Sequence, residues 1–480
     1  MKKFDYRINF KGTLVFLTSY FSASTKIDAE TDTPLLKSGN DMVMLSGSTI
    51  TGKIKNMLEK IIPIELLEDI FGSQKKSSRL TINDSLQKIS SAIRHGVVIN
   101  RDTLAAQNGL LYDRELTPPY ARFPLSMQLC SSQEKLTKDL KVMQLIKQAL
   151  ENCFINFGGG STRGCGFVKL ESSSIETFKL SDNDELAAYL ANEPAVKKHT
   201  AENNKTNEIY SDTGNYFTAM IHYTLKFDEG VITAGEEQPQ TLSEKGSKEE
   251  ADLFPYFMTT DEKDEYYIIP GSSIKGVLRN KAEDIYRHKK LSTKICAPGN
   301  AGGFCNDEYK NSNAPENLCE CCKLFGANGY ASKVLFSDLI STKKVKDDTI
   351  QKMEHVAIDR FTGGSIESAK FDETVIQNSE FHGMITVNTD KLEHFNILAH
   401  LALEMADGKI RIGHSTRKGF GKAMPRIDSV SLMAYNKNDN AVIKELMLDE
   451  NIKIIPAAEF ISKIKKLRTE IENKWEVSGK

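Results

Sequence analysis

The sequence lacks the features that mark several specialised classes of protein. It has a single Trp among 480 residues, and aromatic residues make up only 8% of the chain, so an aliphatic core is expected. Neither sign of charge is in excess, because 63 Lys and Arg stand against 65 Asp and Glu. This balance argues against a basic nucleic-acid coat, although a local basic groove is compatible with a neutral total.

Long apolar runs are also missing. No segment approaches the ~20 apolar residues that a membrane-spanning helix needs. The basic start of the chain is not followed by the apolar block of a signal peptide. We therefore expect a cytoplasmic protein without membrane association. With 40% hydrophobic and 27% charged residues the composition is that of a globular protein, and 480 residues are enough for two or more domains.

Repeated motifs indicate an internal duplication. Four pairs of similar segments follow one another in the same order: 45–56 and 269–280, 70–72 and 324–326, 99–103 and 358–362, and 158–166 and 413–421. One such pair could arise by chance. Four pairs in one order indicate two copies of one domain.

Each copy shows the same order of predicted elements. Alternating apolar residues predict a first strand near residues 6–10 and again over 217–227. A helix follows, with Ser48 or Ser272 as the expected cap, and a second helix (140–154 or 395–406) precedes the glycine-rich segment. This order predicts an α+β fold with two tandem ferredoxin-like, RRM-type cores.

The predicted boundaries divide the chain into four parts. The first domain covers 1–172 and the second covers 213–432. A polar linker over 173–212 separates them, since its centre has no apolar periodicity. The segment 433–480 is expected to be a helical extension, because Phe460, Ile464 and Ile471 recur at helical spacing.

Basic and small residues near the repeated glycines are candidates for binding RNA phosphates. Glycine lets a ligand approach the backbone closely, and helix N-termini attract anions. A tight turn or a solvated helix face would explain any one of these charges alone, but the repetition favours binding. The candidates are Ser48, Lys53, Lys55, Gly159, Arg163, Ser272, Lys275, Arg279, Arg417 and Lys418.

Five of the eight cysteines crowd into one insertion in the second copy, over 296–322. In a reducing compartment such a cluster indicates metal binding rather than disulfides. Four thiolates can form a closed structural zinc site, and Cys321 could replace a neighbour. Free thiols in a loop, or an iron–sulfur cluster, are the alternatives. The predicted zinc ligands are Cys296, Cys305, Cys319 and Cys322.

Together these motifs resemble the RAMP superfamily. Their order is most similar to the backbone ribonuclease subunits of type III CRISPR effector complexes. The second copy carries the resemblance most closely, in 269–276, 358–362 and 413–421, and Asp32-Thr33-Pro34 carries it in the first. The resemblance covers both copies, and the tandem arrangement looks like the fused double-backbone subunit of the type III-D variety.

The resemblance implies partners and a reaction. It implies that the chain binds guide crRNA together with other type III effector subunits, and that thumb-like hairpins over 79–122 and 343–381 displace nucleotides of the target RNA. It also implies that Arg101 and Arg360, in the repeated thumb motif, bind RNA.

The same resemblance implies that a loop Asp cleaves the target RNA with a divalent metal such as Mg²⁺. Asp32 matches the family's Asp-x-Pro position, and Asp28 is the fallback in the same loop. Asp252 is the candidate of the second copy, although it stands one residue from the expected spacing, and Asp261 and Asp264 lie nearby.

Three alternatives remain open. Both copies could form an RNA-binding scaffold that does not cleave. The chain could be a guide-RNA-processing endoribonuclease, although the His or Tyr constellation expected of one is not recognisable. It could also be a zinc-stabilised interaction protein that binds no RNA.

Overall fold

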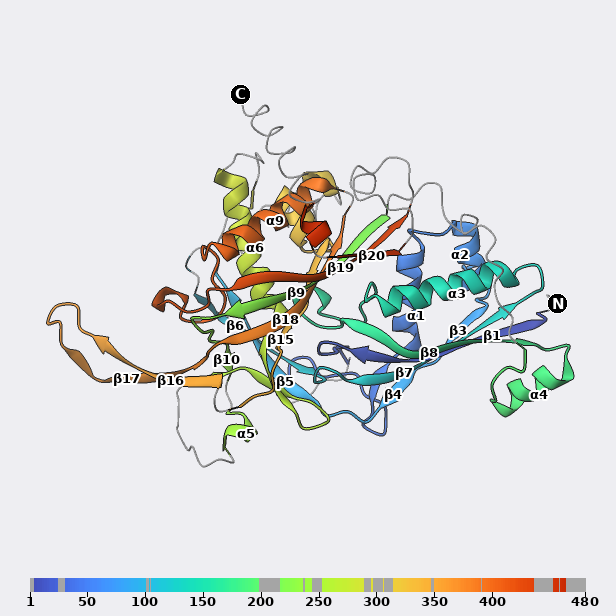
Figure 1. Ribbon diagram of the computed structural model, residues 1–480, viewed down its shortest axis with the longest axis horizontal. Coiled ribbons are helices and arrows are strands. Elements are labelled where there is room, and N and C mark those ends of the chain that lie inside the picture. The colour runs from blue at the N-terminus through green and yellow to red at the C-terminus, as the bar shows by residue number, and fades with distance from the viewer. Residues whose placement is uncertain are drawn as a thin grey trace, which may run out of the picture.

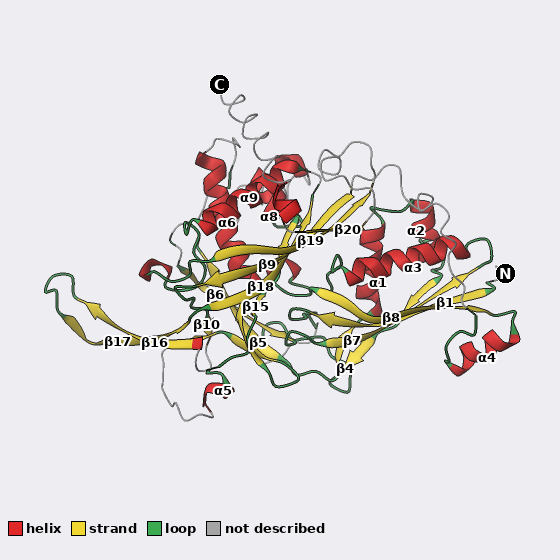
Figure 2. Cartoon of the chain, viewed as in Figure 1, coloured by secondary structure: helices red, strands yellow, loops and turns green. Residues whose placement is uncertain are grey.

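The structure is a computed structural model, and it describes most of the chain. The described residues are 4–24, 31–100, 103, 105–197, 216–235, 238–243, 253–288, 295–296, 305, 314–346, 349–389, 391–435, 452–456 and 458–462. Two lobes lie side by side, the first copy on the right of Figure 1 and the second on the left. In each lobe the main helices cover one face of a sheet, as Figure 2 shows.

The first copy contains a four-stranded antiparallel sheet with the order β3-β7-β1-β8. Helix α1 follows β1, and α3 connects β7 to β8. This is the strand–helix–strand–strand–helix–strand connectivity that the sequence predicts. The elements are β1 (Tyr6–Phe16), α1 (Gly47–Leu58), β3 (Leu80–Ile82), β7 (Arg122–Ser131), α3 (Leu136–Glu151) and β8 (Val168–Lys179).

The second copy repeats this arrangement. Its central strands have the order β14-β18-β9-β19, which matches that of the first copy strand for strand. The duplication predicted from the sequence is therefore present in the topology. The elements are β9 (Tyr216–Phe227), α6 (Gly271–His288), β14 (Val334–Phe336), β18 (Ser379–Asn388), α9 (Leu392–Ala406) and β19 (Met424–Tyr435).

Shorter elements extend both cores. In the first copy these are β2 (Val43–Leu45), α2 (Ile64–Phe71), β4 (Ser85–Gln87) and α4 (Asn183–Ala191). In the second they are β10 (Ala234–Gly235), α5 (Gln240–Ser243), β11 (Phe254–Pro255), β12 (Phe257–Thr259), β13 (Glu265–Ile269), α8 (Glu320–Phe325), β15 (Leu339–Ser341) and β20 (Ile452–Pro456).

Helix α1 forms where the sequence predicts it, but its cap differs. Ser46 is the N-cap, and its hydroxyl accepts a hydrogen bond from the Thr49 N–H at 3.2 Å. The expectation that Ser48 caps the helix is wrong, because Ser48 lies exposed in the first turn. Ile50 and Ile54 are fully buried, so this stripe anchors the helix to the sheet.

A β-hairpin projects from each core within the segments predicted as thumbs. The first thumb pairs β5 (Ala92–Ile99) with β6 (Ala106–Leu116), and the second pairs β16 (Ile350–Ile358) with β17 (Ser365–Ile376). The second thumb extends far from its lobe at the left of Figure 1. At its tip, Phe361 is fully exposed next to the charged residues Asp359 and Arg360.

The sheet of the second copy extends past residue 432, and the two cores touch. Strand β19 runs to Tyr435 and pairs with β20. Met220, Met384 and Met433 on the outer face of this sheet join the buried cluster of the first copy. Strand β8 and α4 occupy part of the predicted linker, and most of the expected C-terminal helix lies outside the described residues.

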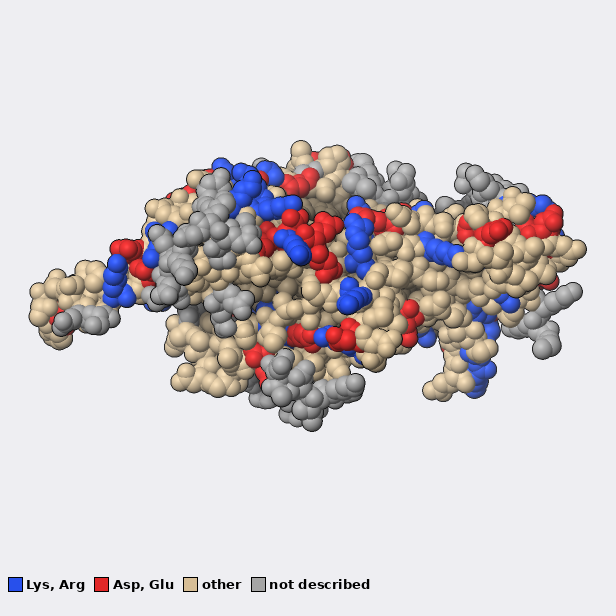
Figure 3. Space-filling view, turned by 90° about the horizontal axis from the view of Figure 1, so that it is seen from below, with Lys and Arg blue, Asp and Glu red and all other residues tan. Residues whose placement is uncertain are grey.

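The charge distribution on the surface and the character of the described helices match the expectations from composition. On the face shown in Figure 3, basic and acidic side chains are interspersed, and the outer part of the projection at the left shows few charged side chains. Among the described helices, none combines the length and apolar character needed to cross a membrane.

Candidate nucleic-acid interface

The two glycine-rich loops, 158–166 and 413–421, have the same backbone conformation. Each contains a short 3-10 helix, Ser161–Arg163 (η1) or Thr416–Lys418 (η5). Left-handed φ angles occur at corresponding positions, for example 113° at Gly164 and 108° at Gly419. The loops therefore bring their basic residues to equivalent places in the two copies.

The glycine-rich loop of the first copy docks on helix α6 of the second. The Gly164 carbonyl accepts a hydrogen bond from the Asp338 N–H at 3.0 Å, and the Gly271 N–H donates to Asp338 Oδ1 at 2.8 Å. A Cβ atom at Gly164 would overlap the Asp338 carboxylate, so this position requires glycine. The docking places η1 beside the first turns of α6.

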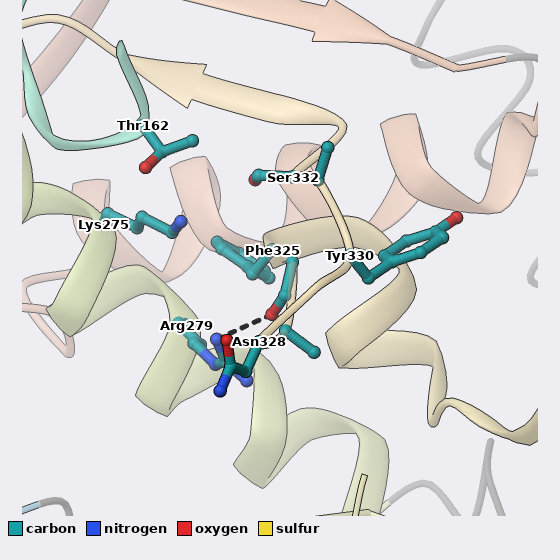
Figure 4. Close-up of a pocket in the computed structure, with 10 residues that line it drawn as sticks. Thr162, Lys275, Arg279, Phe325, Asn328, Tyr330 and Ser332 are labelled. Carbon is teal, nitrogen blue, oxygen red and sulfur yellow. Dashed lines mark hydrogen bonds between the residues drawn. The ribbon is translucent and has the colours of Figure 1, made fainter. Parts of the chain in front are cut away.

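A pocket of about 320 Å³ opens at this junction. Figure 4 shows Lys275 and Arg279 on α6, with Thr162 of the first copy above them. The Arg279 guanidinium donates a hydrogen bond to the Gly326 carbonyl at 3.0 Å. The lining thus comes from both copies, and it comprises Thr162, Lys275, Arg279, Phe325, Gly326, Ala327, Asn328, Tyr330, Ala331 and Ser332.

The charge at this junction is positive. Burial lowers the pKa of Lys275 to about 8, and the nearby Arg279 and Arg163 act in the same direction. Burial and Arg163 also lower the pKa of Arg114 on the first thumb. The charge of Arg163 therefore acts both on Arg114 of the first thumb and on Lys275 of the pocket. We call Arg114, Arg163, Lys275 and Arg279 the basic strip. A phosphate bound along it would relieve the repulsion that Arg163 exerts on Arg114 and Lys275, whereas Arg279 already pairs with Glu283 at 3.1 Å.

Asp32 lies at the stem of the first thumb. Its Oδ2 accepts a hydrogen bond from the Asp113 N–H of β6 at 3.0 Å. The next residue, Thr33, pairs with Arg114, and its carbonyl accepts from the Glu115 N–H at 3.1 Å. Asp32 is nevertheless exposed, so its carboxylate is held in place and accessible next to the start of the basic strip.

The second copy uses the same pairing at its own thumb. Leu253 pairs with Glu373, and the hairpin registers make Glu373 the counterpart of Arg114. Leu253 is therefore the counterpart of Thr33, and the preceding residue in the sequence, Asp252, corresponds to Asp32. Asp252 itself, like Asp28, lies outside the described residues.

The two other carboxylates near Asp252 have different partners. Asp261 Oδ1 accepts hydrogen bonds from the Ser90 N–H and hydroxyl of the first copy, at 3.2 and 2.8 Å. Asp264 forms an ion pair with Lys344 at 2.7 Å. These contacts give both carboxylates a structural role.

Several predicted RNA contacts lie apart from the strip. Lys53 and Lys55 are on α1 of the first copy, where Thr51 stands at the position of Lys275. Lys418 is held by Glu373, with Nζ–Oε distances of 3.0 and 3.1 Å, whereas Arg417 beside it is exposed.

The remaining predicted contacts are scattered. Arg360 is exposed at the tip of the second thumb, next to a turn in which Asp359 accepts from the Phe361 and Thr362 N–H groups. Gly159 packs against Phe21, and Ser272 lies in the first turn of α6. Arg101 lies outside the described residues.

The four cysteines predicted as zinc ligands come together. Their Sγ atoms lie within 4.8 Å of one another, and all four residues are buried. A tetrahedral zinc site with ~2.3 Å Zn–S bonds has ligand spacings of about 3.8 Å, so the group can hold Zn²⁺. Cys321 is not part of it, because its Sγ lies 4.0 Å from Glu283 Oε1.

The cysteine group contacts the pocket through Arg279. The guanidinium donates to Cys322 Sγ at 3.2 Å, and its Nε pairs with Glu283 at 3.1 Å. A cation beside a thiolate is a common outer contact of a metal site. Sequence reasoning assigned Arg279 to RNA alone, and nothing in the spacing indicated this second contact.

Arg94 and Asp338 are residues of the junction between the copies that sequence reasoning missed. They form a buried ion pair between the copies at 2.7 Å. Burial opposes the charge of Arg94, but the Asp338 carboxylate raises the pKa of Arg94 well above its ordinary value. Asp84 and Asp338 follow the corresponding strands β3 and β14 at the same distance, and this recurrence is the sequence feature that could have indicated Asp338.

Comparison with protein-family models supplies the decisive finding. The RAMP superfamily model matches residues 13–169 and 253–423, which together make up more than half of the chain. The chain belongs to the RAMP superfamily. The two matched stretches correspond to the two copies, so the protein contains tandem RAMP domains. A search of curated proteins found no match.

Membership in the RAMP superfamily indicates a CRISPR-associated RNA-binding subunit that works with RNA and protein partners. The composite pocket and the basic strip are consistent with this role, because cationic side chains bind RNA phosphates.

Proposed function

We propose that this RAMP protein is a guide-crRNA-binding backbone subunit of a type III CRISPR ribonucleoprotein, and that it cleaves complementary target RNA beside nucleotides displaced by its thumbs. One observation carries the proposal. The Asp32 carboxylate accepts a hydrogen bond at the stem of a projecting hairpin, and the next residue, Thr33, pairs with Arg114 of the basic strip. An accessible acid is thus held where a hairpin would interrupt a duplex.

The proposed reaction follows from RNA geometry. A duplex keeps each 2′-OH out of line with the adjacent phosphate, and displacing a nucleotide releases that restraint. The basic strip would hold the phosphates on one side of the displaced nucleotide. Asp32 would accept the proton of the 2′-OH as its oxygen attacks the phosphorus. The bond from phosphorus to the 5′-oxygen would then break, and that oxygen would take a proton from water, so that the cut leaves a 2′,3′-cyclic phosphate and a 5′-OH.

Metal ions have two separate places in the proposal. As an alternative to acting as the base, Asp32 would hold a divalent cation such as Mg²⁺, which would neutralise charge that develops on the phosphate. Asp32 is the only described residue we assign to it. Zinc would be held by Cys296, Cys305, Cys319 and Cys322, and four thiolates leave no open position for catalysis.

The first test is target-RNA cleavage by the assembled complex with Asp32→Asn. We expect loss of one cut, at least about 100-fold, with unchanged target binding. Asp41→Asn is the matched control, because Asp41 is an exposed loop acid of the same copy. Unchanged cutting at every position would reject Asp32 and favour a scaffold without nuclease activity.

The second copy is tested in the same assay. Asp252→Asn should remove a different cut and leave the Asp32-dependent cut intact, because Leu253 and Thr33 occupy equivalent positions. Asp264→Asn serves as the control, since Asp264 pairs with Lys344. If Asp252→Asn leaves all cuts in place, only the first copy cleaves. Cleavage of repeat RNA by the isolated chain would instead favour guide processing.

A further inference from the structure

The base of the second thumb contains a buried carboxylate, that of Glu373 on β17. Glu373 is only 3% exposed. Its Oε1 accepts a hydrogen bond from the Ser415 hydroxyl at 2.7 Å, and its two oxygens lie 3.0 and 3.1 Å from Lys418 Nζ. On β16, His355 Nε2 lies 3.1 Å from Glu373 Oε2. The carboxylate therefore connects both strands of the thumb to the glycine-rich loop 413–421.

Further contacts keep Lys418 beside this carboxylate. Its Nζ lies 4.4 Å from the centre of the Phe371 ring, and His355 stacks on the same ring. Burial opposes the charge of Glu373, but Ser415 and Lys418 lower the pKa of Glu373 below its ordinary value, so the carboxylate stays ionised at neutral pH. Lys418 therefore already has an anionic partner within its own copy.

The same places in the first copy hold two cations. The hairpin registers make Arg114 the counterpart of Glu373, and the last residues of η1 and η5 make Arg163 the counterpart of Lys418. Burial and the charge of Arg163 lower the pKa of Arg114, because the two cations repel each other. Thumb and loop are thus joined by an ion pair in the second copy, whereas in the first they present two charges of one sign to an anion.

Arg417 is the other cation of the second loop. It stands beside Lys418 but is exposed, and no described residue forms an ion pair with it. Lys418 could reach an RNA phosphate only by leaving Glu373, and a buried carboxylate that loses its partner is costly. Two adjacent cations of one loop therefore differ in their availability to RNA.

We infer that Glu373 takes the place of an RNA phosphate in the second copy, so that Lys418 does not contact RNA and Arg417 provides the phosphate contact of that loop. A carboxylate and a phosphate oxygen are both anionic acceptors for an ammonium group. A cation that is neutralised within the protein releases no counterions from RNA, so it adds nothing to the salt dependence of binding. Glu373 is thus the residue that makes the two glycine-rich loops differ in their contacts to RNA.

The inference rests on the proposed function in one respect, because it takes both loops to face RNA. It does not depend on cleavage. Unchanged cutting by the Asp32→Asn complex would leave it intact, and failure of the experiments below would leave both the cleavage proposal and the basic strip intact.

The first experiment compares the two adjacent cations by the salt dependence of guide-RNA binding to the metal-loaded full chain at pH 7. Arg417→Gln should make the slope of log K against log salt shallower by about 0.7, the value for one contact to a single strand, whereas Lys418→Gln should leave it unchanged. An equal loss of slope in both variants would overturn the inference, because Lys418 would then contact RNA. An unchanged slope for Arg417→Gln would also overturn it.

The second experiment removes the internal anion. Glu373→Gln keeps the size of the side chain but frees Lys418, so the slope should become steeper by about 0.7. Lys418→Gln should cancel this gain in the Glu373→Gln background, although it has no effect in the wild type. The same effect of Lys418→Gln in both backgrounds would contradict the inference, because the two side chains would then act independently.

Glu65→Gln is the matched control, since Glu65 is an exposed acid on α2 and its loss changes the net charge equally. Its slope should equal that of the wild type. A slope as steep as that of Glu373→Gln would assign the effect to net charge and overturn the role of Glu373. The comparison of Arg417→Gln with Lys418→Gln leaves Glu373 in place, so it decides the matter even if Glu373→Gln fails to fold.

Discussion

At the scale of single residues, two glycines from repeated motifs, Gly164 and Gly276, have different structural roles. Gly164 has a left-handed φ of 113° and lies against Asp338, whereas a Cβ atom at Gly276, within α6, would meet nothing within 4 Å. The first glycine is required by packing between the copies. The second leaves the helix backbone open beside Lys275, at a cost in helix stability of about 1 kcal/mol relative to Ala.

These two glycines give a paired prediction. Gly164→Ala should lower the free energy of unfolding by at least about 2 kcal/mol, because both the backbone and the carboxylate oppose a Cβ. Gly276→Ala should raise it by up to about 1 kcal/mol and weaken RNA binding. Urea unfolding and fluorescence anisotropy measure the two effects. Equal stability of the two variants would contradict this assignment.

Lys275 predicts a pH dependence of RNA binding. Its pKa is lowered to about 8 by burial and by Arg279 and Arg163. Phosphate favours the charged form, so binding should be constant below about pH 8 and weaken above it, by up to tenfold per pH unit. Lys275→Arg keeps its charge and should remove the decline. Fluorescence anisotropy between pH 7 and 9.5 measures RNA binding by the wild type and by Lys275→Arg. Identical pH profiles of binding for the two proteins would rule out Lys275 as a phosphate contact.

Sequence reasoning at this scale found the residue types but not all of their partners. Lys275 and Arg163 were candidates because they lie in repeated motifs, and the four cysteines were candidates because they cluster. Arg94 and Asp338 were not, because their importance arises from a contact between residues 244 positions apart. A helix-face charge such as Lys53 carries the same local signal as Lys275, and only the docking of the first glycine-rich loop distinguishes them.

At the scale of elements, the described residues of the cysteine insertion combine the thiol cluster with other contacts: Leu318 is buried in the core of the second copy, and the Cys296 carbonyl accepts a hydrogen bond from Arg287 at 3.0 Å. The insertion also includes the start of α8. Removing zinc with a chelator should lower the free energy of unfolding by at least about 3 kcal/mol and weaken RNA binding, since Arg279 contacts both Cys322 and the pocket.

Two cysteine variants sharpen that prediction. Cys319→Ser should lose bound zinc, whereas Cys321→Ser should keep it, because Cys321 faces Glu283 and not the other thiols. Metal analysis of the purified chains measures this. Zinc lost equally from both variants would mean that Cys321 is a ligand.

The order of elements was predictable because periodicity and repetition act locally. The first strands and the helices after them followed from such patterns, whereas the hairpin thumbs were expected from the resemblance to the RAMP superfamily. The extra strand β20 and the exact pairing of β19 did not, because a sheet edge accepts a strand according to tertiary register. The sequence did name Asp252 as the candidate of the second copy, one residue from the expected spacing, and the pairing of Leu253 with Glu373 supports that correspondence with Asp32.

At the scale of the whole molecule, the two copies form one unit. Three methionines of the second sheet share the core of the first copy, and the Arg94–Asp338 pair closes the contact. Duplication made two domains predictable from the sequence. It did not predict that the pocket would be built between them, because that requires the relative placement of two folded units.

The ion pair predicts how the molecule unfolds. Arg94→Met should cost about 3–5 kcal/mol and separate one unfolding transition into two, since it leaves the Asp338 carboxylate buried and unpaired. Arg122→Met should change stability by less than about 1 kcal/mol, because its pair with Glu171 is exposed. Calorimetry of the metal-loaded chain measures both. A single unshifted transition for Arg94→Met would contradict the account.

The central claim, that RNA lies along the basic strip across both copies, is tested most directly by the salt dependence of guide-RNA binding at pH 7. Replacing Arg163 and Lys275 by Gln should reduce the slope of log K against log salt by about 1.4, whereas Gln at the exposed Lys75 and Lys138 should leave it unchanged. An equal slope for the wild type and the Arg163/Lys275 variant would contradict the claim.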